Sequence, residues 1–88
     1  MNWVYRFDER ALKELRKLGK LAQRDIISYL DERIAAEEDP RRFGKGLKSD
    51  LAGLWRYRVG DYRIVCQIQD GELLVLVVTV GHRRDVYG

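Results

Sequence analysis

The sequence has little of what a disulfide, a metal centre or a cofactor site requires. Cys66 is its one cysteine, which excludes an internal disulfide and a cysteine metal cluster. The chain also has one histidine and no paired carboxylates on a shared face, so a set of catalytic metal ligands is missing. We therefore expect no metal and no other cofactor, and we expect Cys66 to be a buried structural thiol.

Long apolar segments are absent as well. The longest apolar run, residues 73–78, is too short to cross a lipid bilayer. Residues 1–3 do not begin a basic segment followed by an apolar stretch, which is the pattern of a secretory signal. These absences predict a cytoplasmic protein that does not bind a membrane.

Length and charge limit what remains. The 88 residues correspond to one small domain, residues 1–88, with 45% hydrophobic and 35% charged residues, as in a folded protein. Residues 1–40 carry 8 lysines and arginines against 9 acidic residues, whereas residues 41–88 carry 9 against 5. The second part therefore favours a polyanion, foremost a nucleic acid, as partner, and a solvated basic face is the alternative.

The first part of the chain predicts a strand followed by two helices. Alternation of aromatic with aliphatic or charged residues over 3–7 is typical of a short strand. Asp8 can cap a helix that ends at Gly19, and apolar residues recur at helical spacing over 21–34 before Pro40 stops the second helix. We expect these two helices to form a helical hairpin.

The second part predicts a basic loop and then an antiparallel meander. Residues 41–53 show no sustained period, and direct phosphate contact and a flexible solvated connection are about equally favoured for this loop. Its basic side chains are Arg41, Arg42, Lys45 and Lys48. Gly60-Asp61 then joins strands 54–59 and 62–69, and Asp70-Gly71 is a type I′ turn signal leading into a strand over 72–80. The fold class is therefore α+β, with the order strand, two helices, three strands.

Three arginines fall on one face of the first hairpin. Side chains alternate along a strand, so Arg56 and Arg58 lie opposite Tyr57, and a type II′ turn at Gly60-Asp61 places Arg58 beside Arg63. Like charges in this position cost roughly 0.2–1 kcal/mol, so an anionic ligand is the simplest compensation. Pairing with carboxylates such as Asp50, or with a partner chain, is the alternative. We call the surface formed by Arg56, Arg58 and Arg63 the arginine face.

The other face of the meander is the predicted core side. We expect the helices to pack on Trp55, Tyr57, Ile64, Cys66, Val75 and Val77. The same alternation places Val65, Leu74, Leu76 and Val78 on the arginine side. They predict an apolar floor beneath a cationic rim, suited to a base, a partner peptide or local packing.

The tail adds His82, Arg83, Arg84 and Tyr87 near one end of the same sheet. Arginine binds phosphate bidentately and stays protonated, so it stabilises charge but is a poor general base. Among the tail residues, His82 or Tyr87 offers a proton acceptor or a stacking surface, although a surface imidazole and a core-edge tyrosine are the ordinary alternatives. Phosphoryl chemistry here must depend on electrostatic stabilisation and substrate positioning. These residues are a poor catalytic set for a nuclease that acts alone.

Three blocks of the sequence resemble the RelE toxins of the RelE/ParE toxin–antitoxin superfamily. They are FDERALKELRKLG at residues 7–19, GDYRIV at residues 60–65 and VGHRRDVY at residues 80–87. The resemblance implies a metal-independent endoribonuclease that enters the A site of the 70S ribosome and cuts the mRNA there. The 2′-hydroxyl attacks the adjacent phosphate, leaving a 2′,3′-cyclic phosphate and a 5′-hydroxyl. A RelB-like antitoxin is the implied partner.

The resemblance also implies roles for individual residues. Arg56 and Arg58 occupy two strand positions that are lysines in RelE, and Arg63 matches the arginine of a Gly-Tyr-Arg block. Arg83 matches the arginine that protonates the leaving group or stabilises its charge, and Tyr87 matches the tyrosine that stacks on the target base. His82 can substitute as the base, as histidines near this position do in related toxins.

Two other functions stay open at this point. The ParE branch shares the fold and the Tyr-Arg-Ile strand but poisons DNA gyrase. A non-catalytic reading makes the arginine face a docking surface for an antitoxin or a nucleic acid. The complete set of Arg56, Arg58, Arg63, Arg83 and Tyr87 favours RelE.

Overall fold

The chain begins with a strand that leads directly into a helix. The computed structural model describes residues 3–36, 39–82 and 84. Strand β1 (Val4–Phe7) is followed directly by Asp8. The side chain of Asp8 caps helix α1 (Glu9–Arg16) by accepting a hydrogen bond from the backbone N–H of Ala11 at 2.8 Å. The cap predicted from the sequence is confirmed, and it supplies an acceptor for one of the N–H groups that a helix start leaves open.

The second helix follows after three residues. Helix α2 (Lys20–Tyr29) continues into a π-helical turn (Leu30–Ile34). The sequence predicted that the first helix ends at Gly19, but α1 ends at Arg16, and Gly19, with φ −65°, is the N-cap of α2. The N–H of Lys17 closes the last turn of α1 on the carbonyl of Glu14. Within the described ranges, no helix has the length and apolar character needed to cross a bilayer.

The remaining chain forms most of one sheet. Its elements are a 3-10 turn (Pro40–Arg42), β2 (Lys45–Gly46), a 3-10 turn (Ser49–Leu51), β3 (Trp55–Val59), β4 (Tyr62–Gln69), a 3-10 turn (Asp70–Glu72) and β5 (Leu74–His82). In the described part of the chain the strand order is β1-β5-β4-β3-β2, with β1 parallel to β5 and the other neighbours antiparallel. Strand β2 lies inside the segment predicted to be an irregular loop, and it adds an edge to the predicted meander.

The two turns of the meander differ in how well the sequence predicted them. The first is as expected: Gly60 has φ +59°, Val59 pairs with Tyr62 and Arg58 pairs with Arg63. The second is not a two-residue type I′ turn, because pairing ends at Gln69 and Leu74 and leaves a four-residue loop. The positive φ in that loop, +51°, belongs to Leu73 and not to the glycine.

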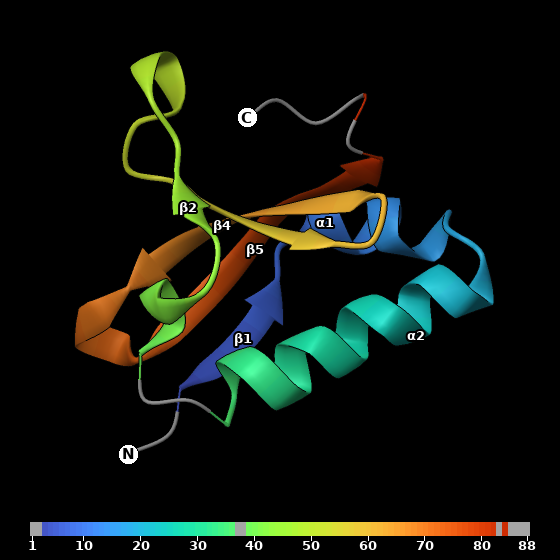
Figure 1. The fold of residues 1–88 in the computed structure, drawn as a ribbon, viewed down its shortest axis with the longest axis horizontal. Coiled ribbons are helices and arrows are strands. Elements are labelled where there is room, and N and C mark those ends of the chain that lie inside the picture. The colour runs from blue at the N-terminus through green and yellow to red at the C-terminus, as the bar shows by residue number, and fades with distance from the viewer. Residues whose placement is uncertain (1–2, 37–38, 83, 85–88) are drawn as a thin grey trace.

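Both helices cover the same face of the sheet (Figure 1). The predicted core side is confirmed, because the helices and the sheet bury one continuous cluster of side chains between them. Its members are Trp3, Ala11, Leu15, Ile26, Leu30, Ile34, Tyr57, Ile64, Cys66, Val75, Val77 and Val80. Burial raises the pKa of the Cys66 thiol, as expected of a structural cysteine.

Strand β5 contains an irregularity that the sequence did not predict. Val77 pairs with Cys66 and both are fully buried. The next pair toward the end of β5 joins Thr79 to Val65, so Val78 is an extra residue opposite the step between Val65 and Cys66. This is a β-bulge, and it changes which side chains of β5 face the helices.

After the bulge the alternation resumes with the faces exchanged. Val80 pairs with Ile64 and is 2% exposed, so it belongs to the core side. His82 pairs with Tyr62 on that side, whereas Gly81 lies opposite Arg63 on the arginine face. Uninterrupted alternation from Val77 would have produced the reverse arrangement.

Candidate functional site

The face of the sheet turned away from the helices gathers the strand arginines. Arg58 lies directly opposite Arg63 in the β3–β4 pair, as the sequence predicted. Arg56 pairs with Val65 on β4 and, on its other side, with Lys45 on β2. Arg58 and Lys45 are exposed, whereas Arg56 and Arg63 are half-buried. Cations therefore lie side by side across three neighbouring strands. Their repulsion is unfavourable in the free protein, and a bound anion reduces it.

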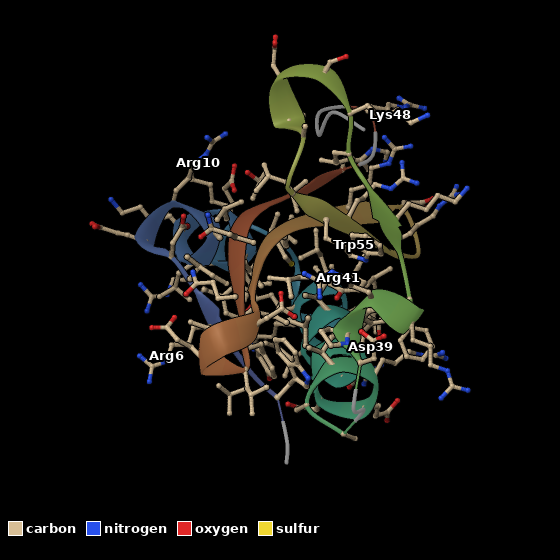
Figure 2. The ribbon with its side chains drawn as sticks, turned by 90° about the vertical axis from the view of Figure 1, so that its left-hand side faces the viewer. Arg6, Arg10, Asp39, Arg41, Lys48 and Trp55 are labelled. Atoms are coloured by element: carbon tan, nitrogen blue, oxygen red, sulfur yellow. The ribbon has the colours of Figure 1, made fainter. Side chains whose placement is uncertain are left out.

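An open hollow borders this face on the side of β2. It has a volume of about 380 Å³, and its lining includes Lys45, Lys48, Ser49 and Arg56. The segment that carries Lys48 and Ser49 projects beyond the sheet, with Lys48 near its base (Figure 2). Val65 lies on this face opposite Arg56, but it is only 4% exposed. Val78, which the sequence placed in the same apolar floor, is the bulge residue, so the predicted floor stays a prediction. The cations suit the phosphates of a nucleic-acid chain.

Two side chains of β3 hold the segment that brings the hollow together. The hydroxyl of Tyr57 donates a hydrogen bond to the carbonyl of Pro40 at 2.7 Å, and Nε1 of Trp55 donates one to the carbonyl of Phe43 at 2.6 Å. Burial is the main cause of the raised pKa of Tyr57, which therefore stays a neutral donor. These bonds fix the backbone immediately before Lys45.

Arg41 and Arg42 lie in the 3-10 turn before β2 and are not part of the arginine face. Arg41 forms a bidentate ion pair with Asp70, Nη1 to Oδ1 and Nη2 to Oδ2, both at 2.8 Å. The hydrogen bond from Arg41 lowers the pKa of Asp70, and the bond to Asp70 raises the pKa of Arg41. The pair ties the 3-10 turn before β2 to the β4–β5 loop, so Arg41 already has an anionic partner within the chain. Arg42 is exposed.

His82 does not join the strand arginines. Because of the bulge its side chain lies on the helix-covered side of the sheet, where its ring meets that of Tyr62 edge to face at 5.8 Å and 73°. Its Nδ1 accepts a hydrogen bond from the backbone N–H of Arg84 at 3.3 Å, and Arg84 is exposed. Arg83 and Tyr87 lie outside the described residues.

Comparison with known proteins identifies the family. A sequence model described as "ParE toxin of type II toxin-antitoxin system, parDE" matches residues 5–87. The chain belongs to this family of toxins. Its α+β fold, which positions the arginine face opposite the helices, is the fold of its relatives.

The relatives of this family member carry RelE-type names. Toxin RelG of Mycobacterium tuberculosis is 32% identical over 87 residues, covering 99% of this chain and 98% of that protein. The mRNA interferase toxin RelE of Escherichia coli is 36% identical over 86 residues, covering 96% and 86%. A solved structure of the toxin–antitoxin complex RelBE2 from M. tuberculosis superposes with a TM-score of 0.85 at 30% identity, covering 94% of this chain and all (100%) of that one.

One contact of this toxin-family chain, between helix α1 and strand β5, was not predicted from the sequence. Glu14 on α1 accepts a hydrogen bond from the backbone N–H of Val80, next to the bulge in β5. A signal was present in the sequence: Glu14 lies at the margin of the apolar stripe, three residues after Ala11 and four before Leu18. An acidic residue so placed reaches the sheet on which the helix packs.

Proposed function

We propose that this toxin is a ribosome-dependent, metal-independent endoribonuclease that cleaves mRNA in the A site. The single observation that carries the proposal is the opposition of Arg58 and Arg63, with Arg56 and Lys45 beside them, on the open face of the sheet. The name mRNA interferase, which belongs to the E. coli relative, supports the same activity. Arg42, Lys48 and Arg84, all exposed, extend the basic surface for RNA.

In the proposed reaction the 2′-hydroxyl of the substrate attacks the adjacent phosphorus while the bond to the 5′-oxygen breaks. The 2′-hydroxyl loses its proton and the leaving 5′-oxygen gains one, so the products are a 2′,3′-cyclic phosphate and a 5′-hydroxyl. Arg56, Arg58 and Arg63 bind the phosphate oxygens and stabilise the charge that develops on them. By the resemblance, Arg83 stabilises the leaving group and Tyr87 stacks on the target base.

The site has few groups able to accept the proton. Arginine stays protonated at working pH, and His82 is the chain's one histidine. In the proposal His82 is the candidate acceptor, although its strand position faces the helices and lies on the side of the sheet opposite to the arginine face. Because few groups of the protein can transfer a proton, the proposal assigns the in-line orientation of the mRNA to the ribosome.

The proposed partners follow from the same surface. A solved relative was crystallised as a toxin–antitoxin complex, and we propose a RelB-like antitoxin for this chain in the cytoplasm. The 70S ribosome with mRNA in the A site is the proposed target. The phosphates of the mRNA complement a face that is cationic across three strands.

Primer-extension mapping of a defined mRNA tests the proposal. The purified toxin is incubated with this mRNA either free or bound to ribosomes programmed with a chosen A-site codon. We expect cleavage inside that codon with ribosomes and little on free RNA. Equal cleavage of free RNA would refute ribosome dependence, and inhibition of DNA gyrase without any cleavage would favour the ParE-like function that the sequence left open.

A matched pair of variants assigns the activity to the arginine face. Arg58→Ala removes an exposed cation opposite Arg63, and we expect the cleavage rate to fall about 10²–10³-fold, as for a donor to a developing negative charge. Arg6→Ala removes an exposed arginine from the same side of the sheet on edge strand β1, opposite Leu76. Arg6 lies far from Lys48 in Figure 2, so its loss should leave the rate unchanged.

A further inference from the structure

Glu14 joins helix α1 to the end of strand β5. Its Oε1 accepts a hydrogen bond from the backbone N–H of Val80 at 3.0 Å, between residues 66 positions apart in the sequence. Its Oε2 lies 3.6 Å from Nε of Arg10, whose side chain is 73% exposed against 28% for Glu14. One carboxylate oxygen therefore accepts the hydrogen bond of the strand, and the other faces Arg10. The side chain of Arg10 lies at the surface (Figure 2).

Strand β5 needs this bond because its second neighbour ends early. Pairing between β1 and β5 stops at Phe7 and Val77, where the N–H of Asp8 also donates to the carbonyl of Val77 at 2.9 Å. Beyond Val77, α1 lies along the edge of β5 that β1 no longer covers (Figure 1). The part-buried N–H of Val80 is directed to that edge, and Glu14 provides the acceptor that a strand carbonyl would otherwise supply.

The bond is also located where β5 changes faces. The bulge lies at Val78, and Val80 is the first buried residue after it. Holding Val80 toward the helices keeps Gly81 opposite Arg63 and keeps His82 against Tyr62. The carboxylate on the helix thus fixes the register of the strand end relative to the arginine face.

We propose that Glu14 is a positioning residue for RNA cleavage. By anchoring Val80 it sets the end of β5, from which the chain continues into the residues that the resemblance assigns to the site. The inference rests on the proposed function. Glu14 does not contact the reacting atoms: its effect is transmitted through the backbone of β5.

Three variants separate this role from general loss of charge or volume. Glu14→Gln keeps an Oε1 acceptor of the same reach, whereas Glu14→Met has a similar length and no carbonyl acceptor. Glu9→Gln is the matched control, because it removes the same charge from the same helix at a side chain that is 87% exposed. Near-ultraviolet circular dichroism confirms that each variant is folded.

Amide hydrogen exchange in the free protein provides the first measurement. We expect slow exchange at Val80 in the natural protein, in Glu14→Gln and in Glu9→Gln. In Glu14→Met the exchange of Val80 should be about tenfold faster, with a shifted His82 ring signal, because the strand end is released. Equal exchange at Val80 in all four proteins would overturn the anchoring role.

Single-turnover cleavage on programmed ribosomes provides the second measurement. Glu14→Met should lower the rate at saturating ribosomes by about 10–100-fold, and the half-saturating concentration should stay unchanged, as for misplaced reacting groups. Glu14→Gln should restore the natural rate. A natural rate in Glu14→Met, an equal loss in Glu14→Gln, or a change confined to the half-saturating concentration would each refute the proposal.

The two measurements distinguish the inference from the proposed function. A natural protein that does not cleave on ribosomes refutes the function, and exchange at Val80 still decides whether Glu14 anchors the strand. If Glu14→Met fails to fold, Glu14→Asp replaces it, because a side chain one methylene shorter moves its carboxylate away from Val80 while keeping the charge. Natural exchange and natural cleavage in Glu14→Asp would then overturn the inference.

Discussion

At the scale of single residues, the pairing of Arg58 with Arg63 lowers the stability of the sheet and favours the binding of an anion. Two cations occupy directly opposed positions on an open sheet face, and Lys45 opposes Arg56 one step further along. A sheet selected for stability alone would place opposite charges there. The arrangement has a physical reason if the face binds phosphate, since the negative charge of the phosphate offsets the repulsion between these cations.

Replacing Arg58 should therefore raise the stability of the free protein and lower its cleavage activity. We expect Arg58→Gln to relieve the repulsion from Arg63, and Arg58→Glu to add attraction, raising the free energy of unfolding by roughly 0.2–1 kcal/mol. Both variants should lose cleavage, because the phosphate loses a cation. Urea unfolding midpoints measured at low and high salt check the stability change.

The salt dependence is the control for this prediction. Screening weakens exposed charge interactions, so the gain of Arg58→Glu should shrink as salt is added. A loss of stability in Arg58→Glu at low salt would show that Arg58 and Arg63 do not repel each other in the folded protein.

At the scale of elements, the short strand β2 depends on one glycine. Gly44 precedes β2 with φ +77°, and a Cβ there would collide with the backbone carbonyl of Arg56 and approach Nε1 of Trp55 at 2.8 Å. The backbone thus passes so close to β3 that no side chain fits. This close approach is what brings Lys45 beside Arg56.

We expect Gly44→Ala to destabilise the protein more than Gly53→Ala does. Both glycines have positive φ, but a Cβ at Gly53 meets nothing within 4 Å, so the two variants share backbone strain and differ in the collision. The collision should cost about 1–3 kcal/mol beyond the strain and displace Lys45 from the hollow. Chemical denaturation measures the difference in free energy, and RNA binding reports on the hollow. Equal losses in the two variants would contradict the close approach.

The sequence predicted those elements whose signals are local. The alternation over β3 and β4, the Gly60 turn and the Asp8 cap all come from neighbouring residues, and each was confirmed. In the second helical stripe Ile26, Leu30 and Ile34 are buried, but Leu21, where the stripe was predicted to begin, is 63% exposed. The four-residue loop before β5 was missed because its positive φ is at Leu73, while the local signal pointed to Gly71. Propensity favours glycine there, but the register at Gln69 and Leu74 determines the turn.

The candidate site was predictable in part for the same reason. Arg56, Arg58 and Arg63 share a face because of simple alternation, which the sequence contains. The faces of Val80 and His82 depend on a bulge at Val78, near the place where β1 ends and Glu14 contacts Val80. That contact joins residues 66 positions apart: the position of Glu14 beside the apolar stripe was visible in the sequence, but its partner on β5 was not. Likewise, the ion pair of Arg41 with Asp70 became apparent only in three dimensions.

At the scale of the whole molecule, the Cys66 thiol and three partly or fully buried phenols determine how the stability of the fold responds to alkali. Burial is the main cause of the raised pKa of Tyr5, Tyr29 and Tyr57, and the hydrogen bond from Tyr5 to Asp31 at 2.6 Å contributes at Tyr5, whose pKa rises to about 12. A raised pKa means that the folded state holds the proton longer than the unfolded chain does. Stability from such a group is complete below its ordinary pKa of 10.0 and is lost as pH rises toward the folded value.

The free energy of unfolding should therefore be steady near neutral pH and begin to fall near pH 9, because the unfolded chain ionises Cys66 at its ordinary pKa of 9.0 while burial raises that pKa in the folded protein. It should fall further between pH 10 and about 12, where the tyrosines contribute. Tyr5→Phe removes one titrating phenol, so the difference in stability between this variant and the natural protein should be constant below pH 10 and shrink above it. Urea unfolding at intervals of pH measures both curves. Curves that stay parallel through pH 12 would show that Tyr5 titrates alike in the folded and unfolded states, and that burial against the π-helical turn and the bond to Asp31 do not protect its proton.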